Sequence, residues 1–274
     1  MALSGGGASG AFGAGYLNGW TSTGKRPVFK VITGVSTGAL MAPFAFLGPD
    51  DDEALRNVYT TTRTRDIFKI GSVVWQLLVP RFVVWNMGLI ASSGHPEALE
   101  LFRKVMLASA SIPVAFPPVM IDVELEPGGR RYDEMHVDGG VGARVFLNAG
   151  VFRGSVIRER GGQGGNGFEE IFVIHNGQLI LVPEAVDRSL SAIAVRVIDS
   201  VGRTAAVGDL FRIYTCARRE RALFQWITIP EDVDLSGDEV FDPVKMQALY
   251  DVGFRLAVTG GGWSTVPPGQ RAEP

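Results

Sequence analysis

A G-x-S-x-G motif is the feature of this 274-residue sequence that most restricts how the chain can fold. The motif, Gly34–Gly38, follows a compact β-rich run, Val28–Thr33, and precedes an apolar run, 38–47, that is typical of a buried helix. Glycines two positions before and two positions after Ser36 relieve crowding where a backbone turns sharply from strand to helix. The motif therefore predicts a tight turn that presents the Ser36 hydroxyl as a nucleophile at the mouth of a parallel sheet.

A second glycine-rich segment, Gly5–Gly10, lies near the start of the chain and precedes apolar residues at helical spacing over Phe12–Trp20. As a G-x-G-x-x-G pattern it could bind a dinucleotide, but that function needs an acidic residue at the end of the second strand, and Val28–Thr33 contains none. A purely structural glycine turn is another alternative. We favour a third interpretation, in which backbone N–H groups at a helix N-terminus face a developing oxyanion. The expected donors are Gly5, Gly6, Gly7, Ala8 and Thr37.

A base that activates Ser36 is the next requirement, and histidine is the usual one. The chain has three histidines, one in a loop and two in β-like runs: His95, His136 and His175. Asp138 instead ends a strand-like run, and two glycines, Gly139 and Gly140, let the chain turn away tightly after it. The pattern favours a Ser36–Asp138 pair, and a Ser36–Asp–His175 triad is the alternative.

These blocks together resemble the patatin-like phospholipase family. They follow the family's order: the glycine loop Gly5–Gly10, the turn Gly34–Gly38, and the turn Asp138–Gly140. A fourth stretch, Ala108–Pro118, resembles the segment that leads into the family's DG[GA] turn, so that the likeness spans most of residues 2–176. One departure is that many relatives carry a basic residue inside the glycine loop, where this chain has Ala8 and Ser9.

The resemblance implies a fold and an activity. The implied fold is a three-layer α/β/α sandwich with a mostly parallel central sheet. The implied activity is that of a lipid acyl hydrolase of the phospholipase A, lipase or esterase type, in which Ser36 attacks the ester carbonyl and Asp138 accepts its proton. The motif glycines Gly10, Gly34, Gly38, Gly139 and Gly140 would shape the site, with no cofactor and no metal. A catalytically silent lipid-binding protein of the same fold is the alternative from another class.

The remaining patterns predict one domain over residues 1–263 and a disordered tail over 264–274. Strand–helix alternation with short turns favours a parallel sheet covered on both faces. The expected elements after the first sixty residues are a hairpin of Val119–Leu125 and Arg131–Val137, a glycine-rich loop at Gly161–Gly167, a strand at Ile171–His175, a helical stretch over 184–222, a strand at Leu223–Ile229, and a helix that begins at Asp242–Pro243.

Residues 67–92 are strongly apolar but are interrupted by charges, glycines and a proline, which is too broken for a membrane-spanning helix. They are expected to form either a buried helix with a loop, or a lid or interfacial surface that meets a membrane or micelle. In the second case Trp75, Phe82 and Trp85 would be the anchors.

Charge and targeting signals restrict the partners. The net charge is −3 and no Lys/Arg block occurs, so nucleic acid is not an expected partner; a lipid or ester substrate is. The single cysteine, Cys216, excludes an intrachain disulfide. The chain shows no signal peptide, which makes the cytoplasm the default location, with secretion or membrane association as the expectation if the natural protein begins earlier.

Overall fold

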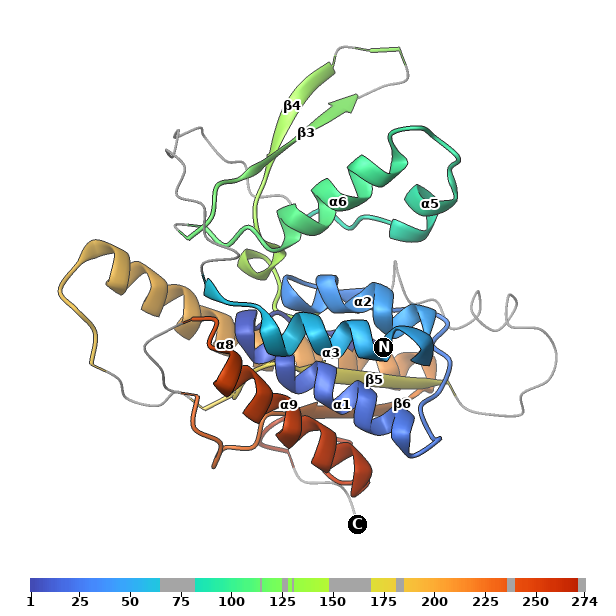
Figure 1. Cartoon of the computed structure of the whole chain (residues 1–274), viewed down its shortest axis with the longest axis vertical. Coiled ribbons are helices and arrows are strands. Elements are labelled where there is room, and N and C mark those ends of the chain that lie inside the picture. Colours follow the sequence, from blue (N-terminus) through green and yellow to red (C-terminus); the bar gives the residue numbers. More distant parts are fainter. Residues whose placement is uncertain are drawn as a thin grey trace.

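A four-stranded parallel sheet organises the main body of the protein (Figure 1). The computed structural model describes residues 1–64, 82–113, 115–124, 128–129, 131–147, 169–180, 185–235 and 240–270. The sheet has the order β2-β1-β5-β6. Its strands are β1 (Ala2–Leu3), β2 (Thr33–Gly34), β5 (Glu170–His175) and β6 (Leu223–Thr228), and all three pairings are parallel. A parallel arrangement requires crossover connections, and helices supply them.

Helices cover both faces of this sheet (Figure 1). One face carries α1 (Gly10–Ser22), α2 (Thr37–Leu47), α3 (Asp52–Thr61) and α9 (Pro243–Val258), and the other carries α8 (Leu190–Glu220). Alternate residues of the central strands point to opposite faces, so Ile174 packs with α1 and α9 while Val173 packs with α8. The three-layer architecture with a mostly parallel sheet, expected from the sequence, is confirmed.

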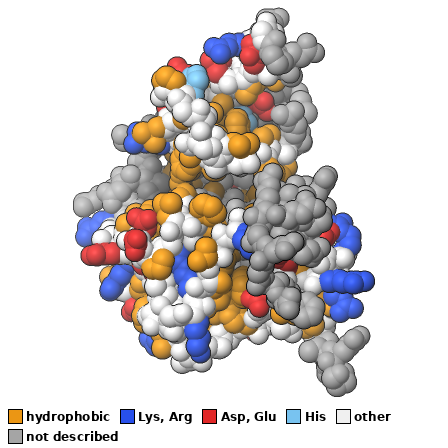
Figure 2. All heavy atoms as spheres, turned by 90° about the vertical axis from the view of Figure 1, so that its right-hand side faces the viewer, with side chains coloured by type: hydrophobic (Ala, Val, Ile, Leu, Met, Phe, Trp, Pro, Cys, Tyr) orange, Lys and Arg blue, Asp and Glu red, His pale blue; other side chains and the backbone are white. Residues whose placement is uncertain are grey.

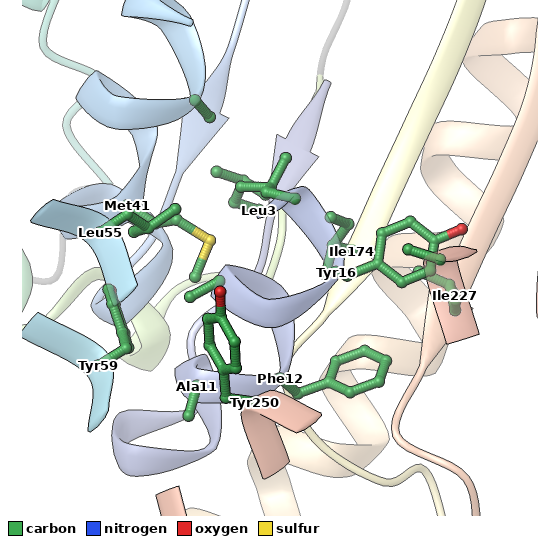
Figure 3. Packing of buried hydrophobic residues seen from close by; sticks show 14 of the residues in the cluster. Leu3, Ala11, Phe12, Tyr16, Met41, Leu55, Tyr59, Ile174, Ile227 and Tyr250 are labelled. Atoms are coloured by element: carbon green, nitrogen blue, oxygen red, sulfur yellow. The ribbon is translucent and has the colours of Figure 1, made fainter. Parts of the chain in front are cut away.

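The larger hydrophobic cluster fills the space between the sheet and α1, α2, α3 and α9 (Figure 3). Leu3, Ile174 and Ile227 project from three strands toward Phe12 and Tyr16 of α1. All five side chains are at most 1% exposed, so this cluster contributes the main apolar burial that holds the site-bearing strands in place.

A smaller part of the molecule stands above the sheet and is here named the cap (Figure 1). It comprises α5 (Met87–Ser92), α6 (Ala98–Ser109) and an antiparallel hairpin of β3 (Val119–Glu124) and β4 (Arg131–His136). Val105, Ala108 and Ile121 form its own buried cluster, against which Trp85 packs. Figure 2 shows hydrophobic side chains along the junction between the cap and the main body.

Two expectations about element boundaries are wrong, for physical reasons. The run Val28–Thr33 is not a full strand, because its neighbour β1 offers only two residues for pairing, and Val28 is 93% exposed. Residues 264–270, expected to be disordered, are held against β6: Ser264 bridges Trp226, and the Trp226 indole donates a hydrogen bond to the Val266 carbonyl at 2.8 Å. Residues 271–274 and the predicted Gly161–Gly167 loop lie outside the described residues.

The apolar segment 67–92 is described only from residue 82. There Trp85 packs into the cap cluster, and the Phe82 ring lies 5.3 Å from that of Phe146 in a T-shaped contact. Trp75, the third expected anchor, lies outside the described residues. None of the helices in the described ranges combines the length and the apolar character that crossing a bilayer requires.

Candidate active site

Ser36 occupies a strained turn between β2 and α2. Its backbone has φ 53° and ψ −126°, a left-handed conformation that residues with a side chain rarely adopt. The flanking glycines permit this turn by close approach: a Cβ on Gly34 would lie 2.3 Å from the Gly38 carbonyl oxygen, and one on Gly38 would lie 2.4 Å from the Leu3 carbonyl oxygen. The strand–turn–helix context that the sequence predicts is therefore present.

Asp138 lies just beyond β4, at the root of the cap hairpin. Its N–H donates to the Ser111 carbonyl at 2.8 Å, and its Oδ1 accepts a hydrogen bond from the Gly140 N–H at 2.6 Å. A Cβ on Gly139 would lie 3.3 Å from a methyl carbon of Val35, so this turn packs directly against the serine turn. Asp138 is 4% exposed, and its carboxylate is therefore held in a low-dielectric setting.

The pKa of Asp138 depends on its burial and on the groups near its carboxylate, the Ser36 hydroxyl among them. Burial raises the pKa of Asp138 above its ordinary value, and the Ser36 hydroxyl, the Gly140 N–H and the positive charge of Arg144 each act to lower it. Oδ2 of Asp138 is buried and has no hydrogen-bond partner in the described part of the chain. The effect of the Ser36 hydroxyl on this pKa indicates that the two side chains are near each other, and Oδ2 is left to accept a further hydrogen bond.

The C-terminal end of α6 connects the two residues. Ser109 Oγ accepts a hydrogen bond from the Ser36 N–H at 3.0 Å, and two residues later the Ser111 carbonyl accepts the Asp138 N–H. The sequence identified this stretch only by its resemblance to a family segment. Its positioning contacts could not be inferred from the sequence, because Ser36 and Ser109 are more than seventy positions apart along the chain.

The glycine loop lies directly against the serine turn, since a Cβ on Gly5 would be 3.3 Å from Ser36 Cβ. The expectation that the Gly5 N–H faces an oxyanion does not fit the structure, because that N–H donates to the Arg144 carbonyl at 2.9 Å. The other expected donors lie at the start of the short helix Gly7–Ser9 or of α2, where backbone N–H groups have no acceptor within the helix. In the described part of the chain, none of them donates a hydrogen bond to a protein acceptor. These are the N–H groups of Gly6, Gly7, Ala8 and Thr37.

Asn176, which directly follows β5, holds this loop in place through contacts with the residues on both sides of it. Its side-chain oxygen accepts the Gly13 N–H at 3.1 Å, and its amide nitrogen donates to the Ser4 carbonyl at 3.0 Å. A Cβ on Gly6 would lie 1.9 Å from the Asn176 carbonyl oxygen, so only glycine allows this approach. Gly10 is restricted in the same way, with Thr37 Oγ1 at 2.3 Å from its virtual Cβ. Sequence reasoning did not identify Asn176.

The histidines are poorly suited to serve as the base. His175 is 3% exposed, and burial, with a smaller effect of the charges on Arg144 and Arg203, lowers its pKa to about 3. A neutral imidazole with so low a pKa is a weak proton acceptor. His95 is exposed, and His136 lies in β4, where its ring centroid is 5.8 Å from that of Trp85.

Comparison with known families agrees with this arrangement over the first part of the chain. Residues 1–97 match the family model of the patatin-like phospholipases. The matched part contains the glycine loop Gly5–Gly10 and the turn Gly34–Gly38, and it ends before Asp138. A search of curated proteins gave no match to the chain. The chain thus carries the sequence pattern of the patatin-like phospholipase family over residues 1–97, and its parallel sheet flanked by helices is consistent with the α/β fold of that family.

Proposed function

We propose that the protein hydrolyses carboxylic esters of lipids through a Ser36–Asp138 dyad. The family match over residues 1–97 supports a lipid acyl hydrolase. The observation that carries the proposal is the meeting of a strained, left-handed Ser36 with a buried Asp138 whose Oδ2 has no partner among the described residues. Backbone strain and buried, unsatisfied polar atoms both concentrate at sites of chemistry.

In the proposed reaction the Ser36 hydroxyl oxygen attacks the ester carbonyl carbon while Asp138 accepts the hydroxyl proton. An ordinary aspartate is a weak base for this step. Burial of Asp138 raises its pKa and makes the carboxylate a stronger proton acceptor. The alcohol then leaves with a proton, and water hydrolyses the acyl-Ser36 intermediate to restore the enzyme.

The oxyanion formed in each step would be stabilised by main-chain donors. The N–H groups of Gly6, Gly7, Ala8 and Thr37 are the candidates, since in the described part of the chain none of them has a protein acceptor. One such donor is typically worth about 3 kcal/mol of transition-state stabilisation. Without an imidazole to relay the proton, these donors would carry a large share of the catalysis.

A substitution series on p-nitrophenyl esters tests the dyad. We expect Ser36→Ala and Asp138→Asn each to lower kcat by about a thousandfold or more, because each removes a group that acts on the reacting atoms. His136→Gln and His175→Gln should keep most of the activity, as measured at neutral pH on variants whose circular dichroism matches the parent. Near-complete loss in the folded His175→Gln protein would support the triad instead.

The silent lipid-binding alternative is separated by a labelling experiment. A fluorophosphonate probe reacts with an activated serine, so the parent protein should be labelled and Ser36→Ala should not. Ser92→Ala provides a matched control outside the site, since Ser92 is exposed at the end of α5 and its removal should still leave a labelled protein. Absence of labelling in the folded parent would contradict the proposed activity.

A further inference from the structure

Arg144 places a positive charge beside both proposed catalytic residues. A Cβ on Gly5 would lie 3.3 Å from Ser36 Cβ and 3.9 Å from Arg144 Nη1. Ser36 Cβ and Arg144 Nη1 are therefore separated by at most the sum of those two distances. In the same way, a Cβ on Gly140 would lie 2.8 Å from Asp138 Oδ1 and 3.4 Å from Arg144 Nη1. The guanidinium therefore lies between the glycine loop and the aspartate turn.

The backbone of Arg144 is firmly anchored on both sides. Its carbonyl accepts the Gly5 N–H at 2.9 Å, and its own N–H donates to Asp209 Oδ2 at 2.8 Å. Asp209 is 3% exposed and also receives the Val145 N–H, so this carboxylate is engaged with the main chain and with Arg212. The protein thus fixes the base of the Arg144 side chain, while in the described part of the chain no residue forms a hydrogen bond with its guanidinium.

The guanidinium itself makes no hydrogen bond or ion pair with any described residue. Comparable arginines are paired: Arg26 contacts Asp52 at 2.7 Å, and Arg203 contacts Asp199 at 3.0 Å. Arg144 is partly buried, and although the Asp138 carboxylate is near enough to feel its charge, the guanidinium N–H groups have no acceptor among the described residues, so an incoming anion would satisfy them.

A small cavity opens at this guanidinium. It has a volume of about 70 Å³, and its lining includes Gly5, Gly6, Arg144, His175 and Asn176. Arg203 and Asp199 also line it, but their charges offset each other in an ion pair, and the buried His175 is neutral. Arg144 therefore gives the cavity a net positive charge directly beside the glycine loop.

Gly202 of α8 makes room for the guanidinium. A Cβ at this position would lie 2.6 Å from Arg144 Nε and 2.8 Å from its Cζ. Alanine would be preferred over glycine inside a helix by about 1 kcal/mol. The glycine at this position thus has a packing role, which is to let the arginine lie flat against the helix.

We propose that Arg144 binds the anionic group of the substrate, the oxygens of a carboxylate or a phosphate, in the cavity beside Ser36, and so makes the enzyme prefer anionic over neutral esters. This proposal rests on the ester hydrolase function proposed above. The planar guanidinium suits carboxylate and phosphate alike through paired N–H donors. The charge near the reacting centre then selects the substrate, while Ser36 and Asp138 carry out the chemistry.

The first test compares matched esters. Mono-p-nitrophenyl glutarate and p-nitrophenyl valerate share their acyl chain length and differ by a carboxylate on the acyl side. Lysophosphatidic acid and the corresponding monoacylglycerol differ by a phosphate on the alcohol side. The quantity compared is kcat/KM for the anionic ester divided by kcat/KM for its neutral partner. In Arg144→Gln we expect this ratio to fall by about tenfold for the pair whose anion reaches the cavity, and in Arg144→Lys we expect it to recover in part.

Two further variants sharpen this comparison. Gly202→Ala keeps the charge but displaces the guanidinium, so it should lower the same ratio. Arg103→Gln removes one exposed positive charge on α6 and should leave the ratio at the parent value. A ratio that is unchanged in Arg144→Gln for both ester pairs, or one that falls equally in Arg103→Gln, counts against a local role for Arg144.

The second test does not depend on turnover. Inorganic phosphate is titrated into Ser36→Ala, and the rise in Tm is compared with that of Ser36→Ala/Arg144→Gln and Ser36→Ala/Arg103→Gln. We expect the rise to be lost only in the Arg144 double variant. If phosphate binding needs Arg144 but the parent cleaves no ester, the proposed function fails and the anion site stands. If esters are cleaved but neither the ratio nor the phosphate effect depends on Arg144, this inference is overturned and the proposed function stands.

Discussion

At the scale of single residues, Ser36 and Asp138 are both held in states that folding alone would not favour. Ser36 has a φ of 53°, and side-chain-bearing residues in such conformations cost about 1–3 kcal/mol. Asp138 keeps a buried carboxylate whose pKa is raised by desolvation. Neither feature stabilises the fold, and together they bring a hydroxyl and a carboxylate near each other, as the proposed dyad requires. On the proposed function, these two positions give up stability for catalysis.

The strain at Ser36 can be measured with two inactive variants. Ser36→Gly and Ser36→Ala both remove the hydroxyl, but only glycine adopts the left-handed φ without strain. We expect Ser36→Gly to have a free energy of unfolding about 1 kcal/mol higher than Ser36→Ala in urea titrations. At Ser200, inside α8, the order should reverse by about 1 kcal/mol in favour of alanine. If alanine is the more stable variant at Ser36 as well as at Ser200, no strain is stored at Ser36.

At the scale of elements, glycine allows α1 and α9 to approach closely. A Cβ on Gly15 would lie 2.0 Å from the Tyr250 carbonyl oxygen, and one on Gly253 would lie 2.1 Å from the Phe12 carbonyl oxygen. The backbones of the two helices are therefore in direct contact. Because α1 begins at the end of the glycine loop, this packing also fixes the loop against β1 and the serine turn.

Substitution in this contact should destabilise the protein even though alanine favours helices. We expect Gly253→Ala to lower the free energy of unfolding by about 2 kcal/mol, since the helices must move apart to admit a methyl group. Gly208 lies in α8, and apart from its own helix no atom of the described residues is within 4 Å of a Cβ at this position, so Gly208→Ala should be neutral or stabilising by up to about 1 kcal/mol. Thermal unfolding of the two variants checks the difference in sign.

At the scale of the whole molecule, the site is assembled from segments that are far apart along the chain. The glycine loop comes from the first strand–helix connection, Ser36 from the second, Asp138 from the root of the cap, and Asn176 from the end of β5. Strands of a parallel sheet end on the same edge, and this brings the loops after β1, β2 and β5 together. The arrangement therefore depends on the complete sheet.

This assembly explains what the sequence could predict. Glycine turns have local backbone requirements, so the serine turn and the Asp138 turn could be recognised from Gly34, Gly38 and Gly139. The roles of Ser109 and Arg144 depend on contacts across the fold, and neither residue carries a local pattern. The expected role of Gly5 at the oxyanion fails for the same reason, since its N–H donates to the Arg144 carbonyl, a contact across the fold that the sequence does not show.

Acid should destabilise the whole fold through His175. Its pKa is about 3 in the folded protein against an ordinary value of 6.5, so below pH 6.5 the unfolded chain takes up a proton that the folded protein does not. The free energy of unfolding should then fall by about 1.4 kcal/mol per pH unit from this residue as the pH drops toward 3. His175→Gln should lack this contribution to the slope in urea titrations across pH.

The comparison for this prediction is His95→Gln, which removes an exposed histidine and should keep the parent slope. Identical slopes in the parent and in His175→Gln would mean that the buried imidazole is protonated as easily in the folded protein as in the unfolded chain.

The hydrogen bonds that α6 makes to the site determine how the cap can move. Ser109, the last residue of this helix, accepts a hydrogen bond from the main chain of Ser36, and Ser111, two residues later, accepts one from the main chain of Asp138. If the cap moved away from the sheet, Asp138 at its root would move with it, and the Asp138 carboxylate would be separated from the Ser36 hydroxyl. Under the proposed mechanism, a protein whose cap is displaced would therefore be inactive, and an ester would have to reach Ser36 while the cap stays in place.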